Sequence, residues 1–115
     1  MAEDRSEPVS ADDWAQGVGP GWRPIVREAI KKIEALGGRI TQVKEKFGGL
    51  RIYYRTNLQS IHEPISLILR QAESECDKIC EVCGQPGAKK RQLKGWVKTV
   101  CPFHEDVKNW PRRNE

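Results

Sequence analysis

Two pairs of cysteine and histidine residues near the C-terminal end of the chain are the residues best suited to chemistry. Cys80 and Cys83 are separated by two residues and followed by Gly84, and after 17 residues Cys101 and His104 repeat the same spacing. Thiolate and imidazole groups are preferred ligands of zinc, which binds four of them in a tetrahedron. The pattern predicts one zinc ion held by these four side chains, rather than four unrelated buried or surface residues.

Four protein ligands leave no open coordination position, so the predicted zinc is structural rather than catalytic. Zinc binding by isolated fingers contributes on the order of 10 kcal/mol, and here it would be folding energy for a segment with almost no core of its own. Cys76 offers an alternative ligand in place of His104, because it lies one helical turn before Cys80. The other interpretation places Cys76 on the apolar face of a helix.

The residues around the ligands indicate how the zinc module is built. The first two cysteines form a knuckle, and a basic hairpin over about 88–100 follows, turning near residues 93–95. A helix is then expected to start at Pro102, with the last two ligands on its first turn. This order of knuckle, hairpin and helix is the treble-clef arrangement, and we assign residues 80–115 to it.

A helix, a hairpin and a second helix are expected over residues 14–79, which makes the fold class α+β. Apolar residues recur at helical spacing over 24–36, and Gly37 begins a Gly-Gly pair that supplies a left-handed cap. The second helix is expected from a Ser-x-x-Glu capping box at residue 60, with an apolar stripe that continues to residue 79. The acidic residues 1–13 are predicted to be a mobile, disordered tail.

The predicted hairpin consists of strands 39–47 and 50–55, which turn at Gly48-Gly49 so that Phe47 pairs with Leu50. One face is then mainly apolar and carries Thr41, Val43, Phe47, Leu50, Ile52 and Tyr54. The opposite face is polar and carries Gln42, Lys44, Lys46, Arg51, Tyr53 and Arg55. Glu45 interrupts the apolar face, which indicates a bulge or an edge position.

Composition and charge limit the function classes. The chain has 115 residues, 37% of them hydrophobic and 31% charged, with a net charge of +4. No apolar run approaches the length of a membrane span, and the acidic N-terminus is unlike a secretory signal. We therefore expect a cytoplasmic protein, in which paired cysteines hold metal rather than form disulfides. Residues 39–55 have a net charge of +4 and residues 84–100 of +5, which favours an anionic partner.

These two basic segments are the candidate partner-binding surfaces. Basic side chains around an aromatic ring suit a phosphate backbone with one stacked base, whereas the alternative is a solvated hairpin face. Trp96 either stacks on a base or packs across the metal site. The candidate residues of the central hairpin are Lys44, Lys46, Arg51, Tyr53 and Arg55. Those of the zinc hairpin are Lys89, Lys90, Arg91 and Lys94.

Catalysis is not expected. The alternating glycines at 17, 19 and 21 follow no strand, so they do not predict a phosphate-binding loop. Of the two histidines, His104 is assigned to the metal, and His62 has no nucleophile or carboxylate partner near it in the sequence. A zinc nuclease would need further histidines near the last helix. We expect neither an enzyme nor a small-molecule substrate.

Three separated motifs occur in order: Gly21-Trp22, then QVKEKFGGLR over residues 42–51, then CEVCGQPG at residue 80 leading to GWVKTVC at residue 95. Together they resemble small proteins of phages, prophages and bacterial genomes over roughly residues 21–105. The resemblance implies a zinc-binding protein of mobile-element context, and it implies no activity.

Two functions are consistent with these features. The first is a non-enzymatic, zinc-stabilised binding protein whose basic hairpins contact nucleic acid or a nucleic-acid-handling complex. The alternative is a phage-encoded protein-interaction module that inhibits a host or defence enzyme.

Overall fold

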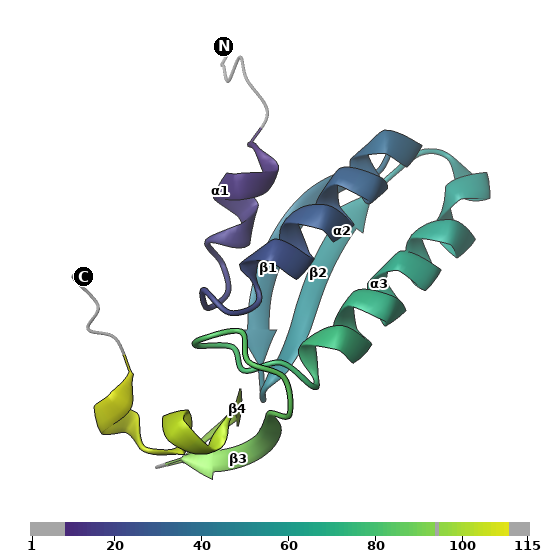
Figure 1. Cartoon of the computed structure of the whole chain (residues 1–115). Helices are drawn as coiled ribbons and strands as arrows, with labels where there is room; N and C mark the ends of the chain where they lie inside the picture. The colour runs from purple at the N-terminus through teal and green to yellow at the C-terminus, as the bar shows by residue number, and fades with distance from the viewer. Residues whose placement is uncertain (1–8, 94, 111–115) are drawn as a thin grey trace.

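The computed structural model of the chain describes residues 9–93 and 95–110, and it has an α+β fold of helices and two antiparallel hairpins (Figure 1). The helices and strands are α1 (Ala11–Ala15), α2 (Arg23–Leu36), β1 (Arg39–Lys46), β2 (Gly49–Arg55), α3 (His62–Cys76), β3 (Lys89–Leu93) and β4 (Trp96–Val100). Three short 3-10 helices are η1 (Gln59–Ile61), η2 (Pro102–Glu105) and η3 (Val107–Asn109).

The two long helices cover one face of the β1–β2 hairpin and lie side by side on it (Figure 1). Helix α2 follows the sequence prediction, with Pro24 in its first turn and Gly37 as a left-handed cap at φ 106°. Its buried stripe packs on α3 and on the hairpin. Because both helices use the same face, no helix of the described residues covers the opposite face of the hairpin, which we call the uncovered face.

Helix α3 differs from its prediction at both ends. The capping box at Ser60 does not form, because Ser60 lies in η1 and the residue that precedes α3 is Ile61, which makes no side-chain cap. The helix ends at Cys76, and Ile79 instead forms an isolated bridge with Pro86. The segment after Cys76 is therefore not helical and connects α3 to the cysteine knuckle of the metal site.

The turn of the central hairpin lies one residue earlier than predicted, so each cross-strand partner is offset by two residues, and Leu50 pairs with Glu45 instead of Phe47. Lys46 pairs with Gly49, and the two turn residues are Phe47 and Gly48, with φ values of 54° and 77°. The Glu45 carboxylate accepts a 2.7 Å hydrogen bond from the Gly48 N–H, which favours this turn over one at Gly48-Gly49. A bulge between Ile40 and Gln42 shifts the pairing by one further residue, so that Ile40 pairs with Tyr54.

Because side chains alternate with a period of two, the offset leaves the faces of the strands as predicted and changes only the residues at the turn and the bulge. Val43, Leu50 and Ile52 face the helices, as predicted, but Phe47 leaves the apolar face and is 67% exposed at the turn. Thr41 is exposed in the bulge. The basic side chains of both strands occupy the uncovered face.

Helix α1 crosses the tail boundary that the composition predicts at residue 13. Ser10 caps it by accepting a hydrogen bond from the Asp13 N–H, and Asp12 forms an ion pair with Arg27 of α2. Its buried Ala15 belongs to the main core. Residues 9–13 are therefore ordered against α2, while residues 1–8 of the predicted tail lie outside the described part of the chain.

Candidate metal centre

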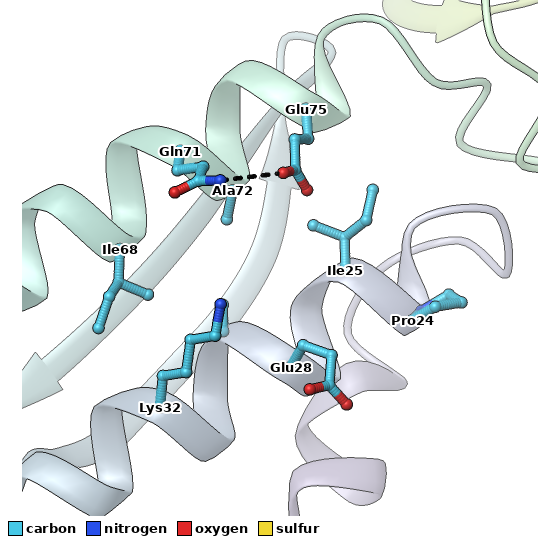
Figure 2. Close-up of a pocket in the computed structure, with 9 residues that line it drawn as sticks. Pro24, Ile25, Glu28, Lys32, Ile68, Gln71, Ala72 and Glu75 are labelled. Atoms are coloured by element: carbon cyan, nitrogen blue, oxygen red, sulfur yellow. Dashed lines mark hydrogen bonds between the residues drawn. The ribbon is translucent and has the colours of Figure 1, made fainter.

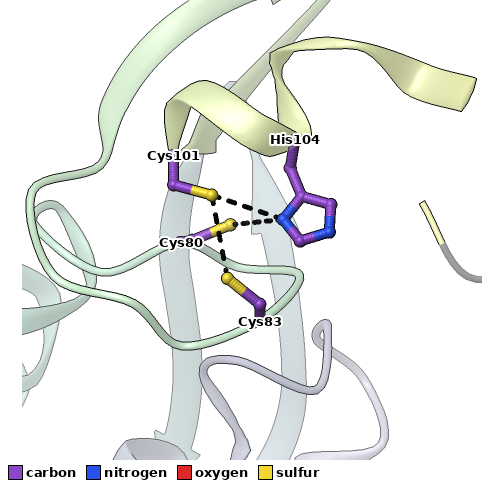
Figure 3. A group of neighbouring side chains, drawn as sticks. All are labelled: Cys80, Cys83, Cys101 and His104. Carbon is purple, nitrogen blue, oxygen red and sulfur yellow. Dashed lines mark hydrogen bonds between the residues drawn. The ribbon is translucent and has the colours of Figure 1, made fainter. Parts of the chain in front are cut away.

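The side chains of Cys80, Cys83, Cys101 and His104 converge at one point of the C-terminal unit (Figure 3). Their ligand atoms all lie within 4.8 Å of one another, and no other group of this kind occurs in the described residues. The cluster can hold one metal ion, and all four cysteines of the chain are free of disulfides.

The distances within the cluster fit tetrahedral coordination. Zinc bound to sulfur at about 2.3 Å and to nitrogen at about 2.0 Å places two sulfurs about 3.8 Å apart, and a sulfur about 3.5 Å from a nitrogen. The Cys83 and Cys101 sulfurs are 3.7 Å apart. The His104 Nδ1 atom lies 3.4 Å from the Cys101 sulfur and 3.7 Å from the Cys80 sulfur. The donor set and its spacing therefore both suit a zinc ion.

The first two ligands lie on a tight knuckle. The Gly84 N–H donates to the Cys80 carbonyl at 2.8 Å, and the Cys80 N–H donates to the Gln85 carbonyl at 2.9 Å. Gly84 has a φ of 84°, a left-handed conformation that glycine adopts without strain. The turn brings the Cys83 thiol back beside the Cys80 thiol, as the C-x-x-C-G pattern predicts.

The last two ligands lie at the start of the helix predicted from Pro102, which is a short 3-10 helix, η2 (Pro102–Glu105). Cys101 follows β4 and is the extended N-cap of η2, and the His104 N–H donates to its carbonyl at 3.0 Å. This turn brings both side chains into the cluster. The Trp110 indole N–H donates to the His104 carbonyl at 2.7 Å and supports the turn.

The thiols of Cys101 and Cys83 differ in pKa because they have different neighbours within the cluster. Burial would raise the pKa of Cys101, but hydrogen bonds from the backbone and ring of His104 outweigh it and lower the pKa to about 6. Desolvation, together with contacts to the Cys80 and Cys101 sulfurs, raises the pKa of Cys83 to about 11. The Cys101 thiol therefore ionises more easily than the Cys83 thiol, and a negative charge on one sulfur disfavours a second charge beside it. A bound divalent cation would remove this repulsion.

Cys76 does not belong to the cluster. It is fully buried among the apolar side chains of the main core, and the four-residue group contains His104 in its place. Desolvation, reinforced by neighbouring acids, raises the pKa of Cys76 to about 12, so the thiol stays protonated. The structure thus favours Cys76 as a core residue over Cys76 as a ligand.

The knuckle is held against the loop before α2, a contact that sequence reasoning missed. The Gly21 N–H donates to the Glu81 carbonyl at 2.9 Å, and the buried Trp22 indole donates to the Ile79 carbonyl at 2.8 Å. A Cβ atom on Gly21 would lie 2.0 Å from the Cys80 carbonyl oxygen, so only glycine allows this approach. The alternating glycines at 17, 19 and 21 were the feature of the sequence that could have predicted this close approach of two backbone segments.

A buried polar network joins the zinc hairpin to the turn of the central hairpin. Lys98 forms a 2.7 Å ion pair with Glu45 and lies 3.7 Å from Glu81. Glu81 is only 5% exposed and also accepts a 2.9 Å hydrogen bond from the Thr99 N–H. The Thr99 hydroxyl donates to the Gly48 carbonyl at 2.6 Å. Glu45, which interrupts the apolar pattern of the central hairpin, therefore pairs with Lys98 of the β3–β4 hairpin.

Glu81 carries a perturbed carboxyl group within this network. Desolvation raises its pKa, although the Thr99 hydrogen bond and Lys98 act in the opposite direction. Its charged form is tolerated because the donors surround it, and removing one of them would leave a buried carboxylate without a partner.

The two basic surfaces differ in how far acids neutralise them. On the zinc hairpin, Lys90 pairs with Asp77 at 2.7 Å and Arg91 with Glu105 at 2.9 Å. Lys89 is exposed there without a carboxylate partner among the described residues, and Lys94 lies outside them. The acidic partners come from segments outside the zinc hairpin, so the strong positive charge of this segment is reduced in the fold.

The central hairpin keeps its positive charge. Within residues 9–93 and 95–110, none of its cations forms an ion pair: Arg39 and the four candidate residues Lys44, Lys46, Arg51 and Arg55. The Lys44 ammonium lies 5.7 Å from the centre of the Tyr53 ring, and Tyr53 is exposed on the same face. Glu73 of α3 and Asp77, which caps the end of α3, border one edge, where they share a pocket with Lys46 and Arg51.

A groove of about 350 Å³ lies between α2 and α3 (Figure 2). Ile25 and Ile68 line it with apolar surface, and Glu28, Lys32 and Glu75 add charges of both signs. Gln71 donates a 3.4 Å hydrogen bond to Glu75 within it. This mixture of charges gives the groove no clear preference for a charged ligand.

The chain matches no protein-family model, no curated protein and no solved structure. Among the described residues, no helix combines the length and the apolar character that a membrane crossing requires. The resemblance to phage and prophage proteins stays a prediction, and the function must be argued from the site itself.

Proposed function

We propose that this is a non-enzymatic, zinc-stabilised protein that binds nucleic acid through the uncovered face of its central hairpin. The observation that carries the proposal is the contrast between the two hairpins. The cations of the central hairpin have no acidic partner among the described residues, whereas Lys90, Arg91 and Lys98 of the zinc hairpin each have one.

Zinc acts structurally in this proposal, in a treble-clef-like unit of knuckle and hairpin. The unit's own core contains only Cys80, Val82, Ala88, Val100 and Cys101, with Leu93 and Trp110 against it. Such a core is too small to fold the segment alone, so the ion supplies the missing free energy. The folded unit then supports the hairpin turn through Lys98 and Thr99.

The binding face suits a phosphate backbone. Lys44 and Arg51 are directly paired across the two strands, and Lys46, Arg55 and the exposed Tyr53 lie on the same face. Four unpaired cations predict that the logarithm of the affinity falls with the logarithm of salt concentration with a slope of about −3 for single strands. Their arrangement on one face provides the electrostatic footprint.

Binding of labelled oligonucleotides to the zinc-loaded protein, measured by fluorescence anisotropy over a salt series, tests the proposal. Lys44→Gln and Arg51→Gln should each weaken binding and reduce the salt slope by about one. Lys31→Gln is the matched control, because this exposed lysine of α2 is paired with Glu28 and lies away from the basic face. Absence of binding at low salt, or an equal effect of the Lys31 substitution, would refute the proposal.

A further inference from the structure

Two exposed aromatic side chains line one groove where the turn of the central hairpin lies against strand β4. Phe47 and Trp96 are 67% and 66% exposed, and they line one groove of about 370 Å³. The other lining residues are Glu45, Lys46, Gly95, Val97 and Lys98. Neither ring serves the core of its own unit, so the groove presents apolar ring surface to a partner.

The backbone at Phe47 adds an independent observation. Phe47 is the only non-glycine residue with a positive φ in the described part of the chain. The first position of such a turn favours Asn, Asp or Gly, and a bulky side chain there is strained. Burial does not offset this strain, because the ring is exposed. Glu45 and Thr99 fix the turn itself, but nothing in the fold requires an aromatic ring at its first position, so the strained and exposed Phe47 indicates a functional role.

The charges around the rings favour an anionic, aromatic partner. The Lys46 ammonium lies 5.6 Å from the centre of the Phe47 ring, and the Lys98 ammonium lies 5.6 Å from the Trp96 ring. Lys98 is already paired with Glu45, whereas Lys46 has no acidic partner among the described residues. Lys46 also belongs to the basic face, so the groove continues directly into the phosphate-binding surface.

From these features we infer that the Phe47–Trp96 groove is a base-stacking site for single-stranded nucleic acid. The inference rests on the proposed function and specifies its ligand. In a duplex the faces of each base are covered by its neighbours, whereas an unpaired base can stack on an aromatic side chain. Unpaired bases enter the groove, and the phosphates follow the cations of the central hairpin.

The Phe47→Asn substitution separates binding from folding. Asn followed by Gly48 is a favoured sequence for this turn, so the variant should unfold at a higher temperature than the wild type. Loss of one stacked base should weaken binding of a labelled 20-nucleotide single strand about 10- to 100-fold. The salt slope should stay unchanged, because no phosphate contact is removed.

Trp96→Ala provides a second readout, because stacking of a base on Trp96 quenches tryptophan fluorescence and this variant should lose that quenching. Leu67→Ala is the matched control, since Leu67 is 57% exposed on α3 and lies outside both surfaces. The probes are oligo-dT, oligo-rU and a duplex of the same length. Tighter binding of either single strand than of the duplex supports the inference, and the stronger of the two identifies the source.

The two proposals fail in different ways. If salt-dependent binding persists but Phe47→Asn and Trp96→Ala leave single-strand affinity unchanged, the stacking site is refuted and the basic face stands. If the duplex binds as tightly as the single strands, the stacking site is also refuted. If no probe binds the zinc-loaded protein at low salt, the proposed function itself fails.

Discussion

The contact between Gly21 and the cysteine knuckle makes Gly21→Ala a sharp test of how the metal unit is attached. The added Cβ atom would lie 2.0 Å from the Cys80 carbonyl oxygen and 2.4 Å from the Gly84 nitrogen, whereas ordinary contacts begin near 3.4 Å. Both neighbours are backbone atoms, so no change of side-chain rotamer relieves the overlap. The loop or the knuckle must move by more than an ångström.

Overpacking of this kind typically costs about 1–3 kcal/mol, and a backbone clash belongs at the upper end of that range. For a chain of 115 residues, about 3 kcal/mol corresponds to a fall in Tm of roughly 12 °C. If the strain is relieved by displacing the knuckle, zinc affinity should fall by about 100-fold, at about 1.4 kcal/mol for each factor of ten.

Thermal unfolding of the zinc-loaded protein and competition for zinc with a chromophoric chelator measure the two effects. Gly49→Ala is the matched control, because its added Cβ atom would lie at an ordinary 3.5 Å from the Lys46 carbonyl oxygen. A Gly21→Ala protein with the Tm and zinc affinity of the wild type would show that the knuckle does not pack on this loop.

Three further predictions concern the network, the ligand set and pH. Lys98→Met should lower the free energy of unfolding, measured by urea denaturation, by about 3–5 kcal/mol, because it leaves two largely buried carboxylates without their cation. Lys90→Met removes an exposed ion pair and should cost less than about 1 kcal/mol. Equal losses in the two variants would contradict the role of the buried network. Elemental analysis should find one zinc per chain in Cys76→Ala and none in Cys101→Ser, and loss of zinc from a folded Cys76→Ala protein would reverse the ligand assignment. The pKa of Glu81 in the folded protein is raised above 4.5, so its contribution to the free energy of unfolding should fall as pH rises through that pKa. The difference in unfolding free energy between the wild type and Glu81→Gln should therefore change between pH 4 and 7. A constant difference would refute the raised pKa.

The metal cluster was predictable because its information is local. Each ligand pair spans only three residue steps, and the turns that bring the pairs into position follow from Gly84 and Pro102. The helix predicted from Pro102 is only a short 3-10 helix, yet its first turn brings His104 back to Cys101, so the cluster forms as predicted. The convergence of the four side chains confirms the predicted cluster, while the zinc ion and its structural role stay proposals.

The hairpin register was not predictable from local sequence. A Gly-Gly pair permits a turn at either Phe47-Gly48 or Gly48-Gly49, and the two choices offset every cross-strand partner by two residues while keeping each side chain on its face. The Glu45 carboxylate and the Thr99 hydroxyl hold Gly48 in the observed position. Thr99 lies 51 residues away in the chain, so only the folded protein brings this contact into play.

The sequence by itself determined the cluster of metal ligands, the two long helices and the existence of both hairpins. These features depend on side-chain period, glycine caps and ligand spacing, which act over a few residues. The tertiary structure decided how the cysteine knuckle attaches to Gly21 and Trp22. It also decided which cations have an acidic partner. It also placed Phe47 beside Trp96. Each of these depends on pairs of residues far apart in the chain, and their contact energies exist only once the chain has folded.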